Sequence, residues 1–157
     1  MSPLSNKEKG DNMINVYLIG RIAEEYHPSN ERLGGLLDNR FEVFMPHKHN
    51  PYNVPHNQLE AEVARIDYDA IERSQVGLIN TAFGEDCSCE IGYYFGSGKP
   101  TVLYAQQPGD WLKTWMAKYA ITAIAVPNQR MASILRKDRI LGQKEIRVVK
   151  TKKELSD

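Results

Sequence analysis

The 157-residue chain contains only two cysteines, Cys87 and Cys89, and only four histidines. One residue separates the two cysteines, and a disulfide across so short a loop would be strained. A structural zinc site needs a second group of ligands at a suitable spacing, which the scattered histidines do not supply. We therefore expect a chain without a cysteine framework and without a metal site.

Neither sign of charge is in excess, since 20 Lys and Arg residues balance 20 Asp and Glu residues. Proteins that bind nucleic-acid polymers or membrane surfaces usually carry a basic excess, so neither partner is expected. No apolar run approaches the ~20 residues of a membrane span. Residues 1–12 lack the apolar stretch of a signal peptide. We expect them to be a flexible leader on a cytoplasmic protein.

Short apolar segments alternate with amphipathic ones along the rest of the chain. Five apolar segments have the length of buried parallel strands, namely 14–20, 41–45, 76–80, 101–105 and 122–126, and a further short strand is indicated at 146–150. Helical spacing of apolar residues covers 31–39, 58–74, 90–96, 110–119 and 128–142. This alternation predicts that residues 13–157 form one α/β domain. Its expected architecture is a three-layer αβα fold, flavodoxin-like or Rossmann-like, around a mostly parallel five-stranded sheet.

Ligands of such domains bind where the parallel strands end at their carboxyl sides. Three connecting segments are expected at those ends: Gly20–Arg21, Pro46–Asn57 and Thr81–Glu90. The middle segment is long for a compact domain, and loops of that length are usually functional or mobile. We expect the three segments to surround one cleft.

The segment 84–93, GEDCSCEIGY, holds three carboxylates within six residues, where a strand passes into a helix. Glu90 is expected near the start of that helix. Backbone N–H groups and the helix dipole would keep a carboxylate there ionised. An ionised carboxylate suits a nucleophile, and the alternative is a glutamate that merely complements the helix dipole.

Three blocks of the sequence occur in the order and at the spacing of a known enzyme family. They are VYLIG at 16–20, IDYDAIERSQV at 66–76 and CEIGYYFGSGKPTVLYA at 89–105. Together they resemble the nucleoside 2-deoxyribosyltransferase family, which includes relatives that hydrolyse nucleoside 5′-monophosphates. The third block resembles the family's signature of a glutamate, an apolar residue and a glycine, followed by Gly-Lys-Pro. The resemblance extends over residues 15–105.

The resemblance implies a double displacement at C1′ of a 2-deoxyribosyl group, without a cofactor. Glu90 matches the family's nucleophile, which would release the base and form a covalent glycosyl-enzyme. A second base or water would then attack the same carbon. Asp67 matches the aspartate that the family places near the base, which implies that Asp67 contacts the base and delivers a proton to it. Tyr17 matches the tyrosine whose hydroxyl orients the nucleophile, although by itself it is also consistent with a core aromatic.

One position departs from the family pattern. The family has an aspartate, or a serine in the phosphohydrolases, six residues before the glutamate, whereas this chain has Gly84. The nearest aspartate, Asp86, precedes Glu90 by four residues, so the loop is shortened. Asp86 either reaches the 5′- or 3′-hydroxyl of the sugar or caps the helix. The departure leaves open which sugar substituents are recognised.

Further polar residues near the expected cleft are candidates for substrate binding. Gly20 and Arg21 end the first strand, and a guanidinium group suits a 5′-phosphate, although a solvated loop arginine is as common. His47 follows the second strand and either contacts a phosphate or base or is simply exposed. Ser88 is a candidate donor to the sugar.

The resemblance also implies a homo-oligomer, because the family builds shared sites across dimers. Asn128 would then reach the site of a neighbouring subunit. Trp111 and Trp115 are four residues apart, which predicts either core packing or an oligomer face.

Acidic residues gather at the expected cleft, whereas basic residues gather between Arg130 and Lys153. A locally acidic cleft favours attack on a neutral sugar over tight binding of a phosphate. We therefore expect transfer of deoxyribose between nucleobases, ahead of hydrolysis of deoxynucleoside 5′-monophosphates. The partners would be small molecules, a deoxynucleoside or deoxynucleotide and a free nucleobase. A nucleotide-binding module without turnover is a third interpretation, which the shortened loop favours.

Overall fold

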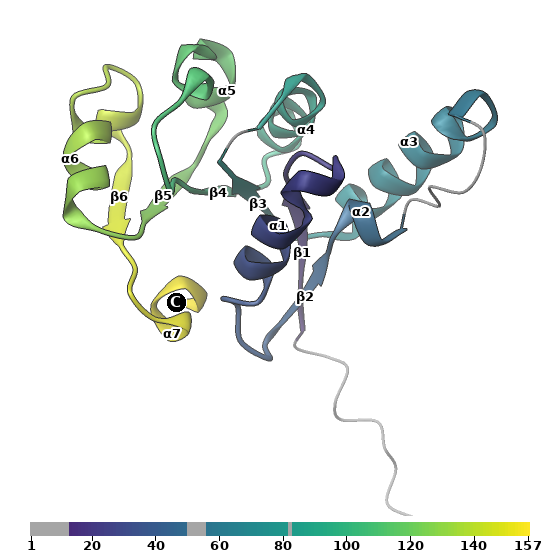
Figure 1. The fold of residues 1–157 in the computed structure, drawn as a ribbon, viewed down its shortest axis with the longest axis horizontal. Coiled ribbons are helices and arrows are strands. Elements are labelled where there is room, and N and C mark those ends of the chain that lie inside the picture. The colour runs from purple at the N-terminus through teal and green to yellow at the C-terminus, as the bar shows by residue number, and fades with distance from the viewer. Residues whose placement is uncertain (1–12, 50–55, 82) are drawn as a thin grey trace, which may run out of the picture.

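The computed structural model describes residues 13–49, 56–81 and 83–157, so the expected leader at 1–12 and part of the Pro46–Asn57 segment lie outside the described residues. Six strands form one sheet in the order β2-β1-β3-β4-β5-β6, and all neighbouring strands are parallel. Their bounds are β1 Ile14–Ile19, β2 Phe41–Phe44, β3 Val76–Asn80, β4 Thr101–Tyr104, β5 Ala123–Val126 and β6 Glu145–Val148 (Figure 1). The predicted α/β fold is confirmed with one strand more than five, because the segment near 146–150 pairs with β5.

Helices cover both faces of this sheet, as the three-layer prediction requires. They are α1 His27–Gly34, α2 Pro46–His49, α3 His56–Arg73, α4 Glu85–Gly96, α5 Trp115–Ala120, α6 Gln129–Arg136 and α7 Lys152–Ser156. Successive strand residues point to opposite faces, so Tyr17 and Ile19 join the core beneath α3 to α6, whereas Val16 and Leu18 join the core beneath α1 and α7. Within the described part of the chain, no helix is long and apolar enough to cross a membrane.

Two helices begin four or more residues earlier than the apolar spacing predicts. α1 begins at His27 rather than at residue 31, because Pro28 suits the first turn of a helix. α4 begins at Glu85, after Gly84 in extended conformation, so Glu90 lies in its second turn. The prediction that Glu90 stands near the helix start is therefore wrong.

The order of the strands reverses between β1 and β3. The chain passes from β1 to its neighbour β2 in one direction and from β3 to its neighbour β4 in the other. In doubly wound sheets, the crevice at such a reversal is the usual ligand site. The connections Gly20–Arg21 and Thr81–Gly84 follow these two strands, so the topology brings them to the same point at the edge of the sheet.

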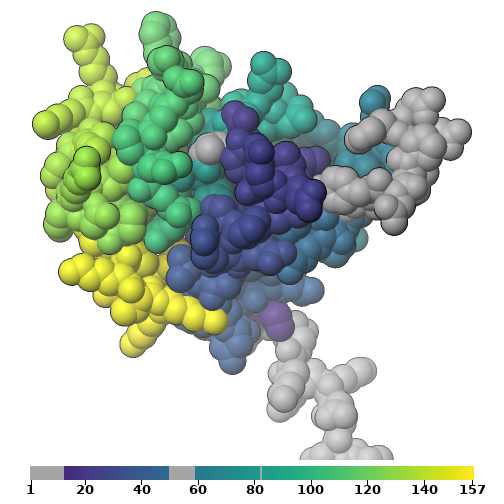
Figure 2. Space-filling model, viewed as in Figure 1, coloured from purple at the N-terminus to yellow at the C-terminus, as the bar shows by residue number. Residues whose placement is uncertain are grey.

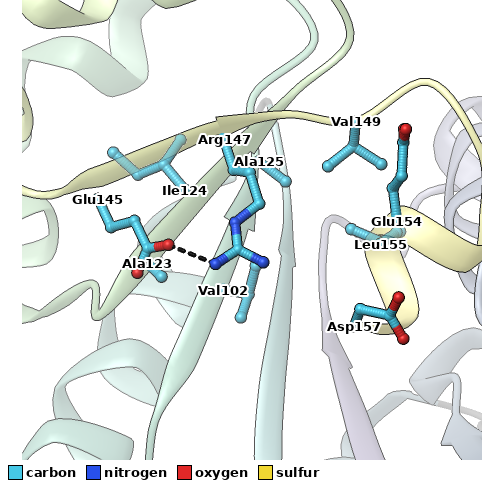
Figure 3. A pocket seen from close by; sticks show the side chains of 10 residues that line it. All are labelled: Val102, Ala123, Ile124, Ala125, Glu145, Arg147, Val149, Glu154, Leu155 and Asp157. Carbon is cyan, nitrogen blue, oxygen red and sulfur yellow. Dashed lines mark hydrogen bonds and ion pairs between the residues drawn. The ribbon is translucent and has the colours of Figure 1, made fainter.

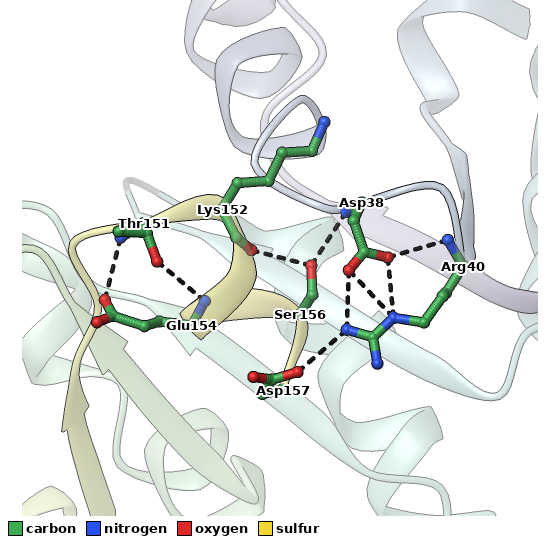
Figure 4. Close-up of polar contacts among 7 residues, drawn as sticks. All are labelled: Asp38, Arg40, Thr151, Lys152, Glu154, Ser156 and Asp157. Atoms are coloured by element: carbon green, nitrogen blue, oxygen red, sulfur yellow. Dashed lines mark hydrogen bonds and ion pairs between the residues drawn. The ribbon is translucent and has the colours of Figure 1, made fainter.

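The C-terminal helix α7 is held against the connection between α1 and β2. Ser156 Oγ accepts a hydrogen bond of 3.0 Å from the backbone N–H of Asp38, and Arg40 bridges Asp38 and Asp157 at 2.8 and 3.1 Å (Figure 4). Figure 2 shows the yellow C-terminal residues in contact with the blue residues of this connection. Hydrogen bonds from Arg40 lower the pKa of Asp38 to about 2, so the contact persists at mildly acidic pH.

Candidate active site

A cleft of about 560 Å³ opens at the carboxyl ends of β1 and β3, where the strand order reverses. Its walls come from the connection between β1 and α1, from the first residue of α2, from α3, and from the first two turns of α4. Five residues that the sequence singles out line it: Gly20, Arg21, Asp67, Asp86 and Glu90. Segments far apart in sequence therefore meet here, as the prediction of one shared cleft requires.

Glu90 meets Tyr17 at the base of this cleft. Glu90 lies on the sheet-facing side of α4, because the core residues Cys87, Ile91 and Tyr94 of the same helix flank it at helical spacing. Tyr17 is fully buried on β1, and its hydroxyl donates a hydrogen bond of 2.7 Å to Glu90 Oε1. Tyr17 is therefore both a core aromatic and a partner of Glu90, which fixes one carboxylate oxygen and leaves the other carboxylate oxygen outside this hydrogen bond.

The protonation of Glu90 is the opposite of the sequence expectation. The pKa of Glu90 is raised to about 8, mainly by burial and also by the nearby carboxyl groups of Asp67 and Asp86, against the hydrogen bond from Tyr17, which lowers it. The helix dipole cannot offset this burial, because its effect is confined to the first turn of a helix and Glu90 lies in the second. At neutral pH, Glu90 is therefore predominantly protonated.

Asp67 faces the same cleft from α3. It lies one turn before Ala70 and Ile71, which are buried against the sheet, so its helix face is turned toward the core. The Oδ1 atom of Asp67 is buried and has no hydrogen-bond partner within the described residues. Burial raises the pKa of Asp67 to about 6. A carboxyl group that can be protonated near neutral pH thus lines the cleft beside Glu90.

The cleft is acidic, as the distribution of charges along the sequence predicts. Among the described residues that line it, one is a cation, Arg21, and five carry carboxyl groups: Glu25, Asp67, Glu85, Asp86 and Glu90. The Arg21 guanidinium lies over the ring of Tyr26 at 5.5 Å from the ring centre. Across the described ranges, no three His, Cys, Asp or Glu side chains are arranged to hold a metal ion.

Three predicted binding residues lie outside the lining of this cleft. Ser88 donates from Oγ to the carbonyl of Gly84 at 3.2 Å and lines a neighbouring cavity. His47 is buried rather than exposed, because its ring stacks on His27 at 4.2 Å and its Nε2 lies 3.4 Å from Glu31. Burial lowers the pKa of His47.

The third of these residues, Asn128, caps α6. Its Oδ1 accepts a 2.9 Å hydrogen bond from the backbone N–H of Met131. Its predicted contact with a neighbouring subunit stays a prediction. The two tryptophans differ: Trp111 is a core residue, whereas Trp115 is 74% exposed and so does not pack in the core.

The structure adds three residues that sequence reasoning missed: Asn30, Asn80 and Gln106. Their side chains are hydrogen-bonded in series beneath the turn after β1. One signal was available in the sequence, because Asn80 is a polar residue at the carboxyl end of a buried strand, where ligand sites of this fold lie. Asn30 and Gln106 carried no such signal.

A separate cavity of about 220 Å³ lies over β4, β5 and β6, where α7 closes one side (Figure 3). Arg147 projects into it and pairs with Glu145 at 2.6 Å, so its charge is balanced within the cavity. None of the residues that the sequence singles out as a candidate site line this cavity. The candidate site is therefore the cleft that contains Glu90.

Comparison with known proteins shows a shared fold. No family model and no curated protein sequence matches the chain. Among solved structures, it is similar to a 2-deoxyribosyltransferase from Bacillus psychrosaccharolyticus, with a TM-score of 0.51 and 17% identity over 70% of this chain and 84% of the other. A conserved protein from Enterococcus faecalis V583 has a TM-score of 0.52 and 16% identity over 92% and 95%.

A third solved structure, a CMP N-glycosidase from Clostridium botulinum, has a TM-score of 0.44 and 17% identity over 90% of this chain and 94% of the other. The 2-deoxyribosyltransferase among these structures has the activity for which the family resembled by the three sequence blocks is named. The fold implied by that resemblance is confirmed.

Proposed function

We propose that residues 13–157 form an enzyme that cleaves the N-glycosidic bond of 2-deoxynucleosides and transfers the sugar to a second nucleobase. One observation supports this most directly. Tyr17 Oη and Glu90 Oε1 are hydrogen-bonded at 2.7 Å, and Glu90 lines a cleft large enough for a small ligand at the strand reversal. The protein from Bacillus that shares this fold is a 2-deoxyribosyltransferase.

The reaction would proceed in two balanced steps. The Glu90 carboxylate attacks C1′, an ester bond forms, and the bond from C1′ to the base breaks with its electron pair moving to the ring nitrogen. That nitrogen takes a proton from Asp67, as general acid catalysis requires. A nitrogen of a second base then attacks C1′, expels the Glu90 carboxylate and returns a proton to Asp67. Two displacements at one carbon retain its configuration.

Tyr17 would orient and activate the nucleophile. Its hydroxyl holds Oε1 of Glu90, which leaves the second oxygen to attack, and its hydrogen bond favours the ionised form of Glu90. Burial raises the pKa of the Tyr17 hydroxyl far above its ordinary value, so Tyr17 remains a donor at every relevant pH. The acidic lining stabilises the positive charge that develops on the sugar.

A second candidate is hydrolysis of nucleoside 5′-monophosphates, and the observation that favours it is Arg21 in the cleft wall. Arginine binds phosphate groups well. Five acidic side chains share the described lining of the cleft with this single cation, which disfavours binding of a dianionic group. We therefore place the neutral nucleoside first.

The acceptor distinguishes these functions. The protein is incubated with 2′-deoxyuridine or with 2′-deoxyuridine 5′-monophosphate, each with and without adenine, and the products are separated by chromatography. Transfer predicts 2′-deoxyadenosine when adenine is present. Equal release of free deoxyribose with and without adenine indicates a hydrolase, and release only from 2′-deoxyuridine 5′-monophosphate indicates the nucleotide substrate. Absence of all products from the wild type indicates a binding module.

The variant Glu90→Gln tests the proposed nucleophile, with Glu62→Gln as the matched control. Glu62 is exposed on α3 and does not line the cleft, so its substitution makes the same chemical exchange away from the site. We expect Glu90→Gln to abolish base release and the covalent glycosyl-enzyme, which mass spectrometry detects in the wild type. Turnover that survives in Glu90→Gln would remove Glu90 from the role of nucleophile.

We also propose that the protein assembles with further copies of itself. Four large apolar side chains are exposed on α4 and α5: Phe95, Trp115, Met116 and Tyr119. Exposed apolar patches of this kind often mark protein–protein contacts. Analytical ultracentrifugation of the wild type and of Trp115→Glu tests this by comparing their masses in solution. An identical mass for both proteins would contradict the proposal.

A further inference from the structure

A series of side-chain amides runs beneath the Gly20–Arg21 turn. Gln106 Nε2 donates to Asn80 Oδ1 at 3.0 Å, and Asn80 Nδ2 donates to Asn30 Oδ1 at 2.8 Å. Asn30 Nδ2 in turn donates to the backbone carbonyl of Arg21 at 2.8 Å. Asn30 and Asn80 are 1% and 3% exposed. The series therefore connects the ends of β4 and β3, through α1, to the residue that places a cation in the cleft.

The direction of this series is determined by its end points. The Arg21 carbonyl can only accept, so the Asn30 amide must donate to it, and the Asn30 oxygen must then accept from Asn80. The Asn80 amide also donates to Ser29 Oγ at 3.0 Å, so its carbonyl oxygen remains for Gln106. Removal of a member leaves a buried polar group without a partner, which is costly.

Gly20 is part of the same arrangement. A Cβ atom at this position would lie 2.5 Å from Oδ1 of Asn30, so a glycine allows the asparagine to reach the turn. The adjoining Arg21 side chain lines both the cleft that contains Glu90 and a neighbouring cavity of about 410 Å³. Arg21 thus stands at the junction of two cavities, at a position that the buried amides hold from below.

We propose that Asn30, Asn80 and Gln106 are positioning residues that hold Arg21 for recognition of the 5′-oxygen of the substrate. This inference rests on the proposed function. With C1′ at Glu90 and the base at Asp67, the 5′ end of the sugar is the part that remains to face Arg21. A neutral hydroxyl suits this cation, because the surrounding carboxylates disfavor a phosphate.

The test is the ratio of kcat/KM for 2′-deoxyuridine to kcat/KM for 2′,5′-dideoxyuridine, which lacks the 5′-oxygen. A hydrogen bond from a charged donor predicts a ratio of roughly 10 to 100 for the wild type. Arg21→Ala should lower the ratio to about 1. Asn80→Ala should lower it at least 5-fold, and the double variant should be no lower than Arg21→Ala, because both substitutions remove one interaction.

Gln75→Ala is the matched control. Gln75 Oε1 accepts a 2.7 Å hydrogen bond from the backbone N–H of Asn15 at the opposite end of β1, so this variant also loses a bond from a side-chain amide to the backbone. It should retain the wild-type ratio. Gln106→Ala provides a second variant in case Asn80→Ala does not fold, because Gln106 is exposed and terminates the series.

The outcomes separate the two proposals. An unchanged ratio in folded Asn80→Ala and Gln106→Ala, or an equal fall in Gln75→Ala, overturns this inference and leaves the proposed function intact. A wild-type ratio near 1 also overturns it, since Arg21 would then not bind the 5′-oxygen. If the wild type releases no base from either substrate, the proposed function fails and this inference fails with it.

Discussion

The wild type should lose stability as the pH rises, and substitution of Glu90 by glutamine should remove this loss. The pKa of Glu90 is raised to about 8 in the folded protein, mainly by burial, from 4.5. The folded state therefore binds more protons than the unfolded state between these values, and its stability falls as the pH increases through this window. Glutamine cannot ionise and can still accept the hydrogen bond from Tyr17, so Glu90→Gln is free of this loss.

The size of the effect follows from the two pKa values. One pKa unit corresponds to about 1.4 kcal/mol, so the complete shift corresponds to roughly 5 kcal/mol. Between pH 5 and pH 8 about 3 to 4 kcal/mol of this develops. For a chain of this size, 1 kcal/mol changes Tm by roughly 2 to 4 °C. The Tm of Glu90→Gln minus that of the wild type should thus increase by roughly 10 °C over this range.

The assay is thermal unfolding followed by circular dichroism at several pH values from 5 to 8, and it requires no substrate. Glu62→Gln serves as the control, because Glu62 is exposed and its difference from the wild type should stay constant. A difference between Glu90→Gln and the wild type that is constant or decreases with pH would refute the reasoning. It would mean that Glu90 is ionised in the folded protein at neutral pH.

Three further predictions follow. A plot of kcat/KM against pH should be bell-shaped for the wild type, with limbs near pH 6 and pH 8. Asp67→Asn should lose the alkaline limb and should reduce the rate by about 10²- to 10⁴-fold. A wild-type profile without an alkaline limb would exclude Asp67 as the acid. Tyr17→Phe should lower kcat roughly 10- to 100-fold, because it removes the donor that favours ionised Glu90, and unchanged kinetics would contradict that role. Lys118→Met leaves Oδ2 of Asp138 without its 2.6 Å partner, whereas Oδ1 keeps the backbone N–H groups of Ile140 and Leu141, so the loss should be about 1 to 3 kcal/mol in urea unfolding.

Strands were easier to predict from this sequence than the ends of helices. A buried parallel strand appears as a short apolar run, and each run that was predicted as a strand pairs in the sheet. A helix end depends on which polar groups satisfy its terminal N–H groups. Ser29 and Asn30 have the composition of a helix cap, yet both bind Asn80, some 50 residues away. No local pattern contains that information.

The candidate site could likewise be predicted only in part from the sequence. Tyr17, Asp67 and Glu90 could be named because the sequence blocks resemble a family and because strand ends mark the ligand site of this fold. The protonation of Glu90 could not be predicted from its neighbours in sequence, since it depends on burial by segments far along the chain. The amide series through Asn30 and Asn80 has the same origin, because its members meet only after the strands have paired.

The pKa of Glu90 is raised to about 8 and that of Asp67 to about 6, so Glu90 is the carboxyl group of the cleft that holds a proton more firmly. The proposed chemistry needs the reverse arrangement, with Glu90 ionised and the proton on Asp67. That arrangement is the less populated of the two before the substrate binds, because Glu90 holds a proton more firmly than Asp67. The substrate can reverse this preference, because positive charge at C1′ favours an ionised Glu90 and a basic ring nitrogen favours a protonated Asp67. The interaction forms only with the substrate and is strongest in the transition state, which is where binding energy accelerates a reaction.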